Sequence, residues 1–182
     1  PASARTERKI SMPHLRERRS LLSKAKKQKN ANKHRALSAQ QTVPYIAMHM
    51  RGTPATMQGM TSYRDVVEEV VSYFRLRAEQ LRRCGVRRLI LDPGFGFAKT
   101  LEQNYDLLRG LHNLCSLGYP VLAGLSRKSM IYKLLGTTPA EALNGTTALH
   151  WECLRQGAAI LRVHDTREAV EVVRMFDQFM QA

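Results

Sequence analysis

Cysteine is scarce in this chain, and no pair of cysteines has a spacing that indicates a cross-linked or metal-bound framework. Cys84, Cys115 and Cys153 are far apart and odd in number. Neither a CxxC motif nor a Cys/His ligand spacing is present, so no disulfide scaffold or zinc site is predicted. We therefore expect reduced thiols and a cytoplasmic location.

Long apolar runs are missing as well. No stretch of eighteen apolar residues occurs, so no membrane span is expected. The first residues are polar and basic and lack an apolar segment, so no secretory signal is expected either. The chain begins with Pro1 instead of Met, which suggests a fragment or a trimmed chain.

Acidic and aromatic residues are nearly absent from residues 1–42. This stretch carries 12 Lys/Arg against 2 Asp/Glu, a net charge of +10, whereas residues 43–182 carry 17 against 13, a net charge of +4. A segment without sustained apolar periodicity cannot offset its ordering entropy, so we expect residues 1–42 to be a disordered basic leader. The alternative is an arm that binds nucleic acid through phosphate. The absence of aromatic residues for base stacking leaves only non-specific binding.

From residue 43 the pattern becomes that of alternating strands and helices. Short apolar runs, typical of buried strands, alternate with segments of helical spacing. This alternation predicts an α/β fold with a parallel sheet, either an open doubly wound sheet or a (β/α)8 barrel. No Gly-x-Gly-x-x-Gly turn follows the first strand, which disfavours a dinucleotide-binding sheet. The strands are expected at residues 43–48, 88–92, 120–124 and 158–163. Helices are expected from a capping pattern at 62–65 to Gly85, around Leu107 to Leu114 and ending near Gly118, at 127–135, at 139–156 (interrupted at Asn144-Gly145), and around Val170 to Met180.

Polar clusters follow each of the four predicted strands, at the end where parallel α/β folds bind ligands. The clusters are Met48 to Arg51, Asp92 to Lys99, Gly124 to Ser129, and Arg162 to Asp165. The first three have a structural alternative. Asp92 before Pro93-Gly94 could form a turn, the Ser126 to Ser129 segment could be a solvated basic turn, and His49 is more simply a hydrogen-bonded structural histidine than a catalyst.

The chemistry of these clusters indicates a flat ligand that carries an anion. Phe95 and Phe97 are too apolar for an exposed loop, which favours stacking on a planar ring. Ser126-Arg127-Lys128-Ser129 offers hydroxyls, cations and the amides of a helix start, which suit phosphate or pyrophosphate. Arg162 and His164 alternate along one strand, so their side chains leave the same face.

These strings resemble the motifs of one enzyme family. YIAMHMRGTP at 45–54 is similar to the fifth strand and following loop of bacterial dihydropteroate synthases, and LDPGFGFAK at 91–99 resembles their sixth-strand signature. GLSRKS at 124–129 and RVHD at 162–165 resemble the seventh and eighth. The resemblance covers residues 43–182, with 36–42 a candidate for the end of a preceding barrel helix. It implies a (β/α)8 TIM barrel, here only its last four βα units, strands 5 to 8, behind a non-homologous tail.

The resemblance also implies an activity. The family, a sulfonamide target, belongs to folate biosynthesis. It condenses 6-hydroxymethyl-7,8-dihydropterin diphosphate with p-aminobenzoate, giving 7,8-dihydropteroate and diphosphate, with Mg²⁺ assisting the leaving group. By resemblance the p-aminobenzoate side would hold Ser126 and Arg127, and the diphosphate would meet Arg162 and His164. The pterin would be bound by Met48, Asp92, Phe97, Gly124, Lys128 and Arg162.

The family's first four strands have no counterpart here, and with them the expected metal ligand. We therefore expect no metal ligand in this chain and no activity from the chain alone. The partners implied are the two substrates and a second copy in a homodimer. A pterin-binding methyltransferase barrel, which shares the Asp-bearing sixth strand, is the alternative enzyme, although the Ser-Arg-Lys-Ser and Arg-x-His strings favour the synthase.

Overall fold

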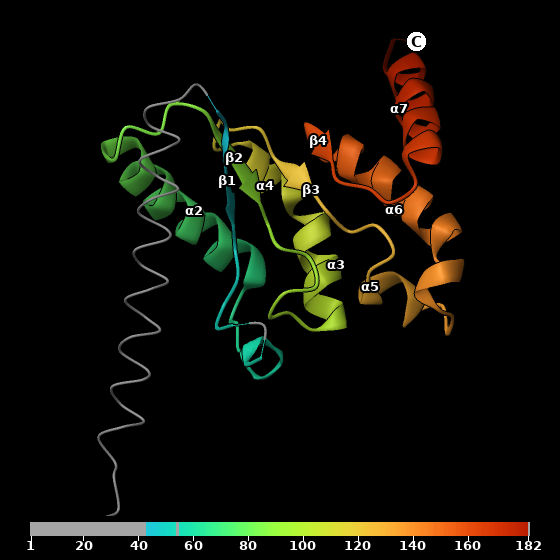
Figure 1. Ribbon diagram of the computed structural model, residues 1–182, viewed down its shortest axis with the longest axis horizontal. Helices are drawn as coiled ribbons and strands as arrows, with labels where there is room; N and C mark the ends of the chain where they lie inside the picture. The colour runs from blue at the N-terminus through green and yellow to red at the C-terminus, as the bar shows by residue number, and fades with distance from the viewer. Residues whose placement is uncertain (1–42, 54, 182) are drawn as a thin grey trace, which may run out of the picture.

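The computed structural model describes residues 43–53 and 55–181. The predicted leader, residues 1–42, lies outside them. Strands and helices alternate as expected (Figure 1). In chain order they are β1 (Tyr45–Met48), the 3-10 helix η1 (Met57–Gly59), α2 (Val66–Arg83), β2 (Leu89–Asp92), α3 (Leu101–Arg109), α4 (Leu111–Cys115), β3 (Leu122–Ala123), α5 (Ser129–Tyr132), the 3-10 helix η2 (Pro139–Glu141), α6 (Leu143–Arg155), β4 (Ile160–Leu161) and α7 (Thr166–Gln181).

The strands are parallel and follow one another in sequence order. β1 pairs with β2, with Met48 opposite Asp92, and β3 pairs with β4, with Ala123 opposite Leu161. A parallel bridge between Leu91 and Val121 joins the two pairs. The carboxyl ends of all four strands therefore point the same way, and the loops that follow them come together at one end of the sheet.

Helix α2 shows why the helical layer forms where the sequence predicts it. Asp65 caps its first turn by accepting hydrogen bonds from the amides of Val67 and Glu68 at 2.8 and 2.9 Å. Its apolar residues recur at helical spacing and are buried, with Phe74 fully enclosed. Gly85 follows in a left-handed conformation that ends the helix.

The helix expected at 127–135 is limited to α5, Ser129–Tyr132, and two further helical predictions differ from the structure. The segment expected as one helix to Gly118 is broken into α3 and α4 at Gly110, where a Cβ would lie 2.7 Å from Val67 Cγ1 of α2. In contrast, Asn144 and Gly145 do not interrupt α6, which continues from Leu143 to Arg155. Gly145 serves close packing here, because a Cβ would lie 2.5 Å from Ile131 Cγ2.

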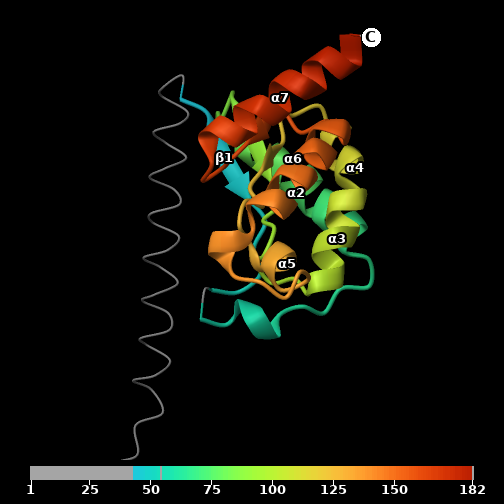
Figure 2. The same cartoon turned by 90° about the vertical axis from the view of Figure 1, so that its right-hand side faces the viewer.

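Helix α2 lies at one side of the molecule and helix α7 at the other (Figure 1). Figure 2 shows α7 crossing above α6. One face of α7 remains exposed, with Met175, Phe179 and Met180 each about two-thirds accessible. Within the described ranges, no helix has the length and apolar character needed to cross a bilayer.

Candidate functional site

Asp92, the last residue of β2, is the buried centre of the loop cluster. Its side chain is 1 % exposed, and Oδ1 accepts a hydrogen bond from the amide of Gly94 at 2.8 Å. Its carbonyl oxygen accepts from the amide of His49 at 2.9 Å, which continues the pairing of β1 with β2. The turn predicted from Asp92-Pro93-Gly94 is therefore real, but it uses only one of the two carboxylate oxygens.

The second carboxylate oxygen of Asp92 can still accept hydrogen bonds. Arg162 Nη1 lies 3.1 Å from Oδ2, an ion-pair distance, but the alignment does not make a hydrogen bond. Among the described residues Oδ2 is buried and accepts no hydrogen bond. A buried acceptor without a donor is costly, so this oxygen is poised to receive a donor from a ligand.

Arg162 reaches Asp92 by crossing over Gly124 at the end of β3. A Cβ at Gly124 would lie 2.5 Å from Arg162 Nη2 and 2.9 Å from its Cζ. The Arg162 side chain is half exposed, so one face of the guanidinium remains open beside the buried carboxylate.

Lys128 and Phe97 form another side of the site that contains Asp92. The Lys128 ammonium lies 4.6 Å from the centre of the Phe97 ring and donates a hydrogen bond to the carbonyl of Phe95. Burial lowers the pKa of Lys128 to about 8, against a raising effect of Asp92, and Arg162 lowers it further. Met48 ends β1 directly opposite Asp92 and is partly buried. The structure thus brings together Met48, Asp92, Phe97, Gly124, Lys128 and Arg162.

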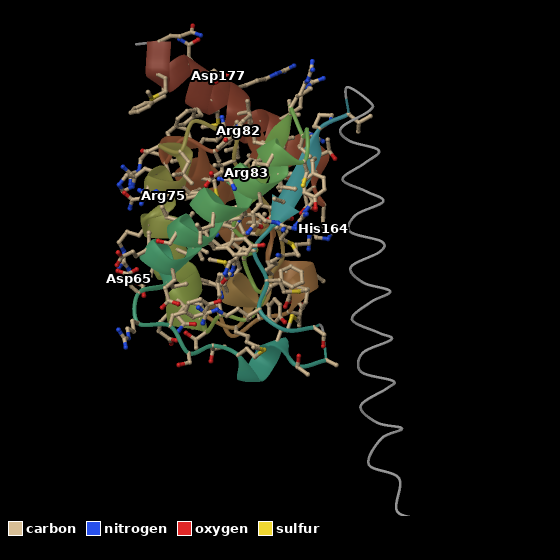
Figure 3. All side chains as sticks on the ribbon, turned by 90° about the vertical axis from the view of Figure 1, so that its left-hand side faces the viewer. Asp65, Arg75, Arg82, Arg83, His164 and Asp177 are labelled. Carbon is tan, nitrogen blue, oxygen red and sulfur yellow. The ribbon has the colours of Figure 1, made fainter. Side chains whose placement is uncertain are left out.

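Ser126 and His164 form a second contact beside this group. The Ser126 hydroxyl is buried, accepts from the backbone amide of His164 at 3.2 Å and lies 3.0 Å from its Nδ1. The His164 side chain itself is exposed, and Figure 3 shows it on the side of the molecule away from Asp65 at the start of α2. It is therefore accessible to an anionic ligand.

Arg127 is committed to internal contacts. Its Nε and Nη2 each donate to Asp165 at 2.8 Å, and its Nη1 donates to the carbonyls of Pro139 and Ala140. This bidentate pair lowers the pKa of Asp165. With φ at 52°, Arg127 turns its side chain away from the loop and ties η2 to the end of β4. Its charged group is therefore engaged by Asp165 and by two carbonyls of η2 rather than by Asp92.

Comparisons with known proteins identify the family of this chain. The family model "Pterin binding enzyme" matches residues 20–164.

The chain belongs to the pterin binding enzyme family.

Relatives within the pterin binding enzyme family point to one activity. The chain is 44 % identical over 150 residues to the dihydropteroate synthase of Escherichia coli (strain K12), covering 80 % of this chain and 52 % of that protein. The dihydropteroate synthase of Thermus thermophilus is 42 % identical. Its complex with 4-aminobenzoate gives a TM-score of 0.77 over 80 % of this chain and 60 % of that one. Its complex with 6HMPPP also gives 0.77, over 80 % and 59 %.

These matches confirm the resemblance inferred from the four motifs and a TIM-barrel-type α/β fold. The chain spans about half the length of the curated relatives that it matches. The matched range begins at residue 20, inside the basic stretch, so the boundary at residue 43 remains a prediction.

The family also implies Mg²⁺, and the described residues do not fit it. No group of three His, Cys, Asp or Glu side chains in residues 43–53 and 55–181 could hold a metal. The carboxylate of Asp92 is instead surrounded by the cations of Lys99, Lys128 and Arg162.

Sequence reasoning did not single out Lys99, whereas the interpretation of His49 as a hydrogen-bonded structural histidine is confirmed. Both are buried at the base of the Asp92 loop, and Lys99 Nζ lies 3.2 Å from His49 Nδ1. Local sequence predicts that a lysine after a glycine-rich turn is exposed to solvent. The one available signal was its position at the end of the LDPGFGFAK string.

Proposed function

We propose that this chain carries the pterin-binding half of a dihydropteroate synthase, and that its four βα units correspond to strands 5 to 8 of the barrel. The observation that carries the proposal is the buried Oδ2 of Asp92, which accepts no hydrogen bond among the described residues and lies beside Lys128, Phe97 and its ion-pair partner Arg162. A pterin presents an amino group and a ring N–H on one edge, and a carboxylate can accept both. The relatives solved with 4-aminobenzoate and with 6HMPPP support this choice of substrates.

Each side chain has a role in holding the substrate. Asp92 accepts from the pterin edge, and Lys128 donates to the ring from the wall that it shares with Phe97. Arg162 lies flat above Gly124, so its guanidinium can stack on the pterin while its open side meets the diphosphate. Met48 packs against the ring from the end of β1. These contacts fix the electrophilic carbon and leave no residue acting as a nucleophile.

The reaction breaks the bond between the pterin methylene and the diphosphate oxygen and forms a bond from that carbon to the amine of p-aminobenzoate. Arg162 and the exposed His164 would stabilise the charge that accumulates on the departing diphosphate. Ser126 would border the p-aminobenzoate side, and Arg127 would act there by shaping the loop, because its own donors are occupied by Asp165 and two carbonyls.

Several features of the whole enzyme are inferred along with the activity. Mg²⁺ would be held by the half that this chain does not match. The homodimer and the cytoplasmic location remain predictions. The free thiols Cys84, Cys115 and Cys153 are consistent with a reducing compartment.

The test joins this chain to the part of a relative that it does not match. Residues 43–182 replace the matching segment of the Escherichia coli relative, and formation of dihydropteroate is measured by mass spectrometry. We expect product from this chimera and none above background from residues 1–182 alone. A folded but inactive chimera would refute the proposal. Turnover by residues 1–182 alone would refute the claim that strands 1 to 4 of the barrel are required.

A further inference from the structure

Lys99 is a buried cation at the base of the loop that follows β2. It is 7 % exposed, and its ammonium contacts three acceptors: the carbonyls of Gly94 and Phe97, at 3.0 and 3.1 Å, and Nδ1 of His49 at 3.2 Å. An ammonium has three protons to donate, so these three contacts use its full capacity. Lys99 therefore has no donor left for a ligand.

The loop that Lys99 fills has an unusual backbone. Gly94, Gly96 and Ala98 have φ of 69°, 77° and 51°, so three of five successive residues adopt left-handed conformations, one of them not a glycine. This path turns the carbonyls of Gly94 and Phe97 inward; the amide of Phe97 already donates to the first at 3.1 Å, and the second needs a buried donor. Lys99 supplies it. The outer side of the loop is fixed separately, by Asn104, whose Oδ1 accepts from the amide of Gly96 at 2.7 Å.

His49 connects this arrangement to β1. Because an ammonium only donates, Nδ1 of His49 must accept, which places the ring proton on Nε2. The ring is buried and packs edge-on against Tyr73, with centroids 5.0 Å apart. The pKa of His49 is lowered to about 3, first by burial and then by the charges of Lys99 and Arg51. Neutral His49 is therefore a fixed acceptor between the two strand ends.

The loop also contacts the end of β1 through its backbone. A Cβ at Gly94 would lie 2.1 Å from the carbonyl oxygen of His49, so the backbone of the loop rests directly on the end of β1. The side chain of Lys99 likewise contacts both the loop and His49 at the end of β1. The two residues that would touch the pterin, Asp92 and Phe97, lie on either side of Gly94 in the loop, and Lys99 follows them.

We propose that Lys99 and His49 form a positioning pair, which locks the loop 94–98 against β1 and so sets the relative placement of Asp92 and Phe97 in the site. The inference rests on the proposed function for the ligand, but the locking of the loop does not depend on it. Lys99 acts through the loop and touches no substrate.

The experiment measures the loop and the ligand separately. Amide hydrogen exchange on residues 1–182 compares wild type with Lys99→Met, and Lys133→Met serves as the control because Lys133 is exposed. We expect exchange in 94–98 to rise about tenfold or more in Lys99→Met, corresponding to about 1.4 kcal/mol of lost local stability, with α2 unchanged. Unchanged exchange in 94–98 would overturn the proposal.

The ligand arm uses the chimera and 6-hydroxymethylpterin as the probe. We expect Lys99→Met to weaken its binding about tenfold and Lys133→Met to leave it unchanged. A loosened loop with unaltered binding would overturn the positioning role. If the wild-type chimera fails to bind the pterin at all, the proposed function fails, while the exchange result still decides whether Lys99 locks the loop.

A spectroscopic signature covers the case in which Lys99→Met does not fold. Nitrogen-15 NMR of wild-type residues 1–182 should show His49 neutral at pH 7 with its proton on Nε2, and a proton on Nδ1 would refute the pair directly. In Lys99→Gln, the loss of the neighbouring charge should raise the pKa of His49, because that charge holds it down. An unchanged His49 pKa would also contradict the proposal.

Discussion

Gly124 and Arg162 lie in direct contact across the ends of β3 and β4, and only a glycine leaves room for the guanidinium that approaches Asp92. The clash with an added Cβ involves the end of a flexible side chain. We therefore expect Gly124→Ala to fold with little loss of stability but to displace Arg162 and weaken binding of the pterin diphosphate about tenfold or more. Titration calorimetry on the chimera measures the affinity, and thermal unfolding measures the stability.

Gly59→Ala is the matched control. A Cβ at Gly59 meets nothing within 4 Å, so both the affinity and the melting temperature should stay at wild-type values. Equal binding by Gly124→Ala and wild type would show that Arg162 does not need its present position.

Arg162→Ala and His164→Ala should act mainly through the diphosphate. Both side chains are exposed at the end of β4, where they can meet an anion. We expect each substitution to weaken binding of the pterin diphosphate more than binding of the phosphate-free pterin, because charge-assisted hydrogen bonds to phosphate are lost only in the first case. Calorimetry with both ligands separates the effects. Equal losses for the two ligands would mean that the residues bind the ring alone.

Buried histidine gives the fold a defined sensitivity to acid. The pKa of His49 is lowered from 6.5 to about 3, chiefly by burial, and burial also lowers that of His150. Between pH 6.5 and about 3 the unfolded chain binds protons that the folded chain does not, so the free energy of unfolding should fall as the pH falls through this window. Each unit of pKa difference corresponds to about 1.4 kcal/mol.

Urea unfolding at a series of pH values checks this expectation. His49→Gln should flatten the pH dependence of the unfolding free energy between about pH 6.5 and 4, and the exposed His112→Gln should leave it unchanged. A wild-type unfolding free energy that is constant across this window would contradict the burial of a neutral His49.

Much of the fold could be predicted from local pattern. The four strands lie within the predicted ranges, and α2 occupies Val66–Arg83, between the predicted capping pattern at 62–65 and the predicted end at Gly85, because short apolar repeats indicate the period of a strand or a helix. The differences came from contacts between elements. Gly110 lies between α3 and α4 whereas Gly145 lies within α6, and each glycine lets its segment pack closely against another helix, through Val67 and Ile131 respectively.

The sequence predicted which residues form the site but not the hydrogen bonds among them. The site residues could be predicted from the ends of the strands, because parallel strands bring their carboxyl ends together. Neither the burial of Lys99 nor the pairing of Arg127 with Asp165, 38 residues away, follows from local sequence. Both depend on long-range hydrogen bonds, and Arg127 in the string SRKS is indistinguishable from a solvent-exposed cation until β4 is in place.

Exposed apolar surface should make the isolated chain associate. Among the described strands, β1 and β4 each pair on one side only, and Ile46 of β1 is half exposed. Met175 and Met180 on α7 add to this surface. We expect residues 43–182 to be oligomeric or to lack fixed packing, because unpaired strand edges and apolar patches favour association.

Sedimentation and calorimetry check the association. Met175→Asp with Met180→Asp should reduce it, whereas Leu76→Asp, an equally exposed position on α2, should not. A monodisperse monomer of residues 43–182 with cooperative unfolding would contradict the expectation.

The most direct test concerns the carboxylate of Asp92, measured as the dissociation constant of phosphate-free 6-hydroxymethylpterin for the chimera and for its Asp92→Asn variant. Asparagine keeps the shape but replaces one acceptor oxygen with a donor, so a pterin donor would face a donor. Mispaired buried polar groups cost about 1–3 kcal/mol, and about 1.4 kcal/mol is a factor of ten. We predict a rise of at least about tenfold in the dissociation constant. Equal binding by the variant and the wild type would contradict the assignment and leave Asp92 as a turn-forming residue.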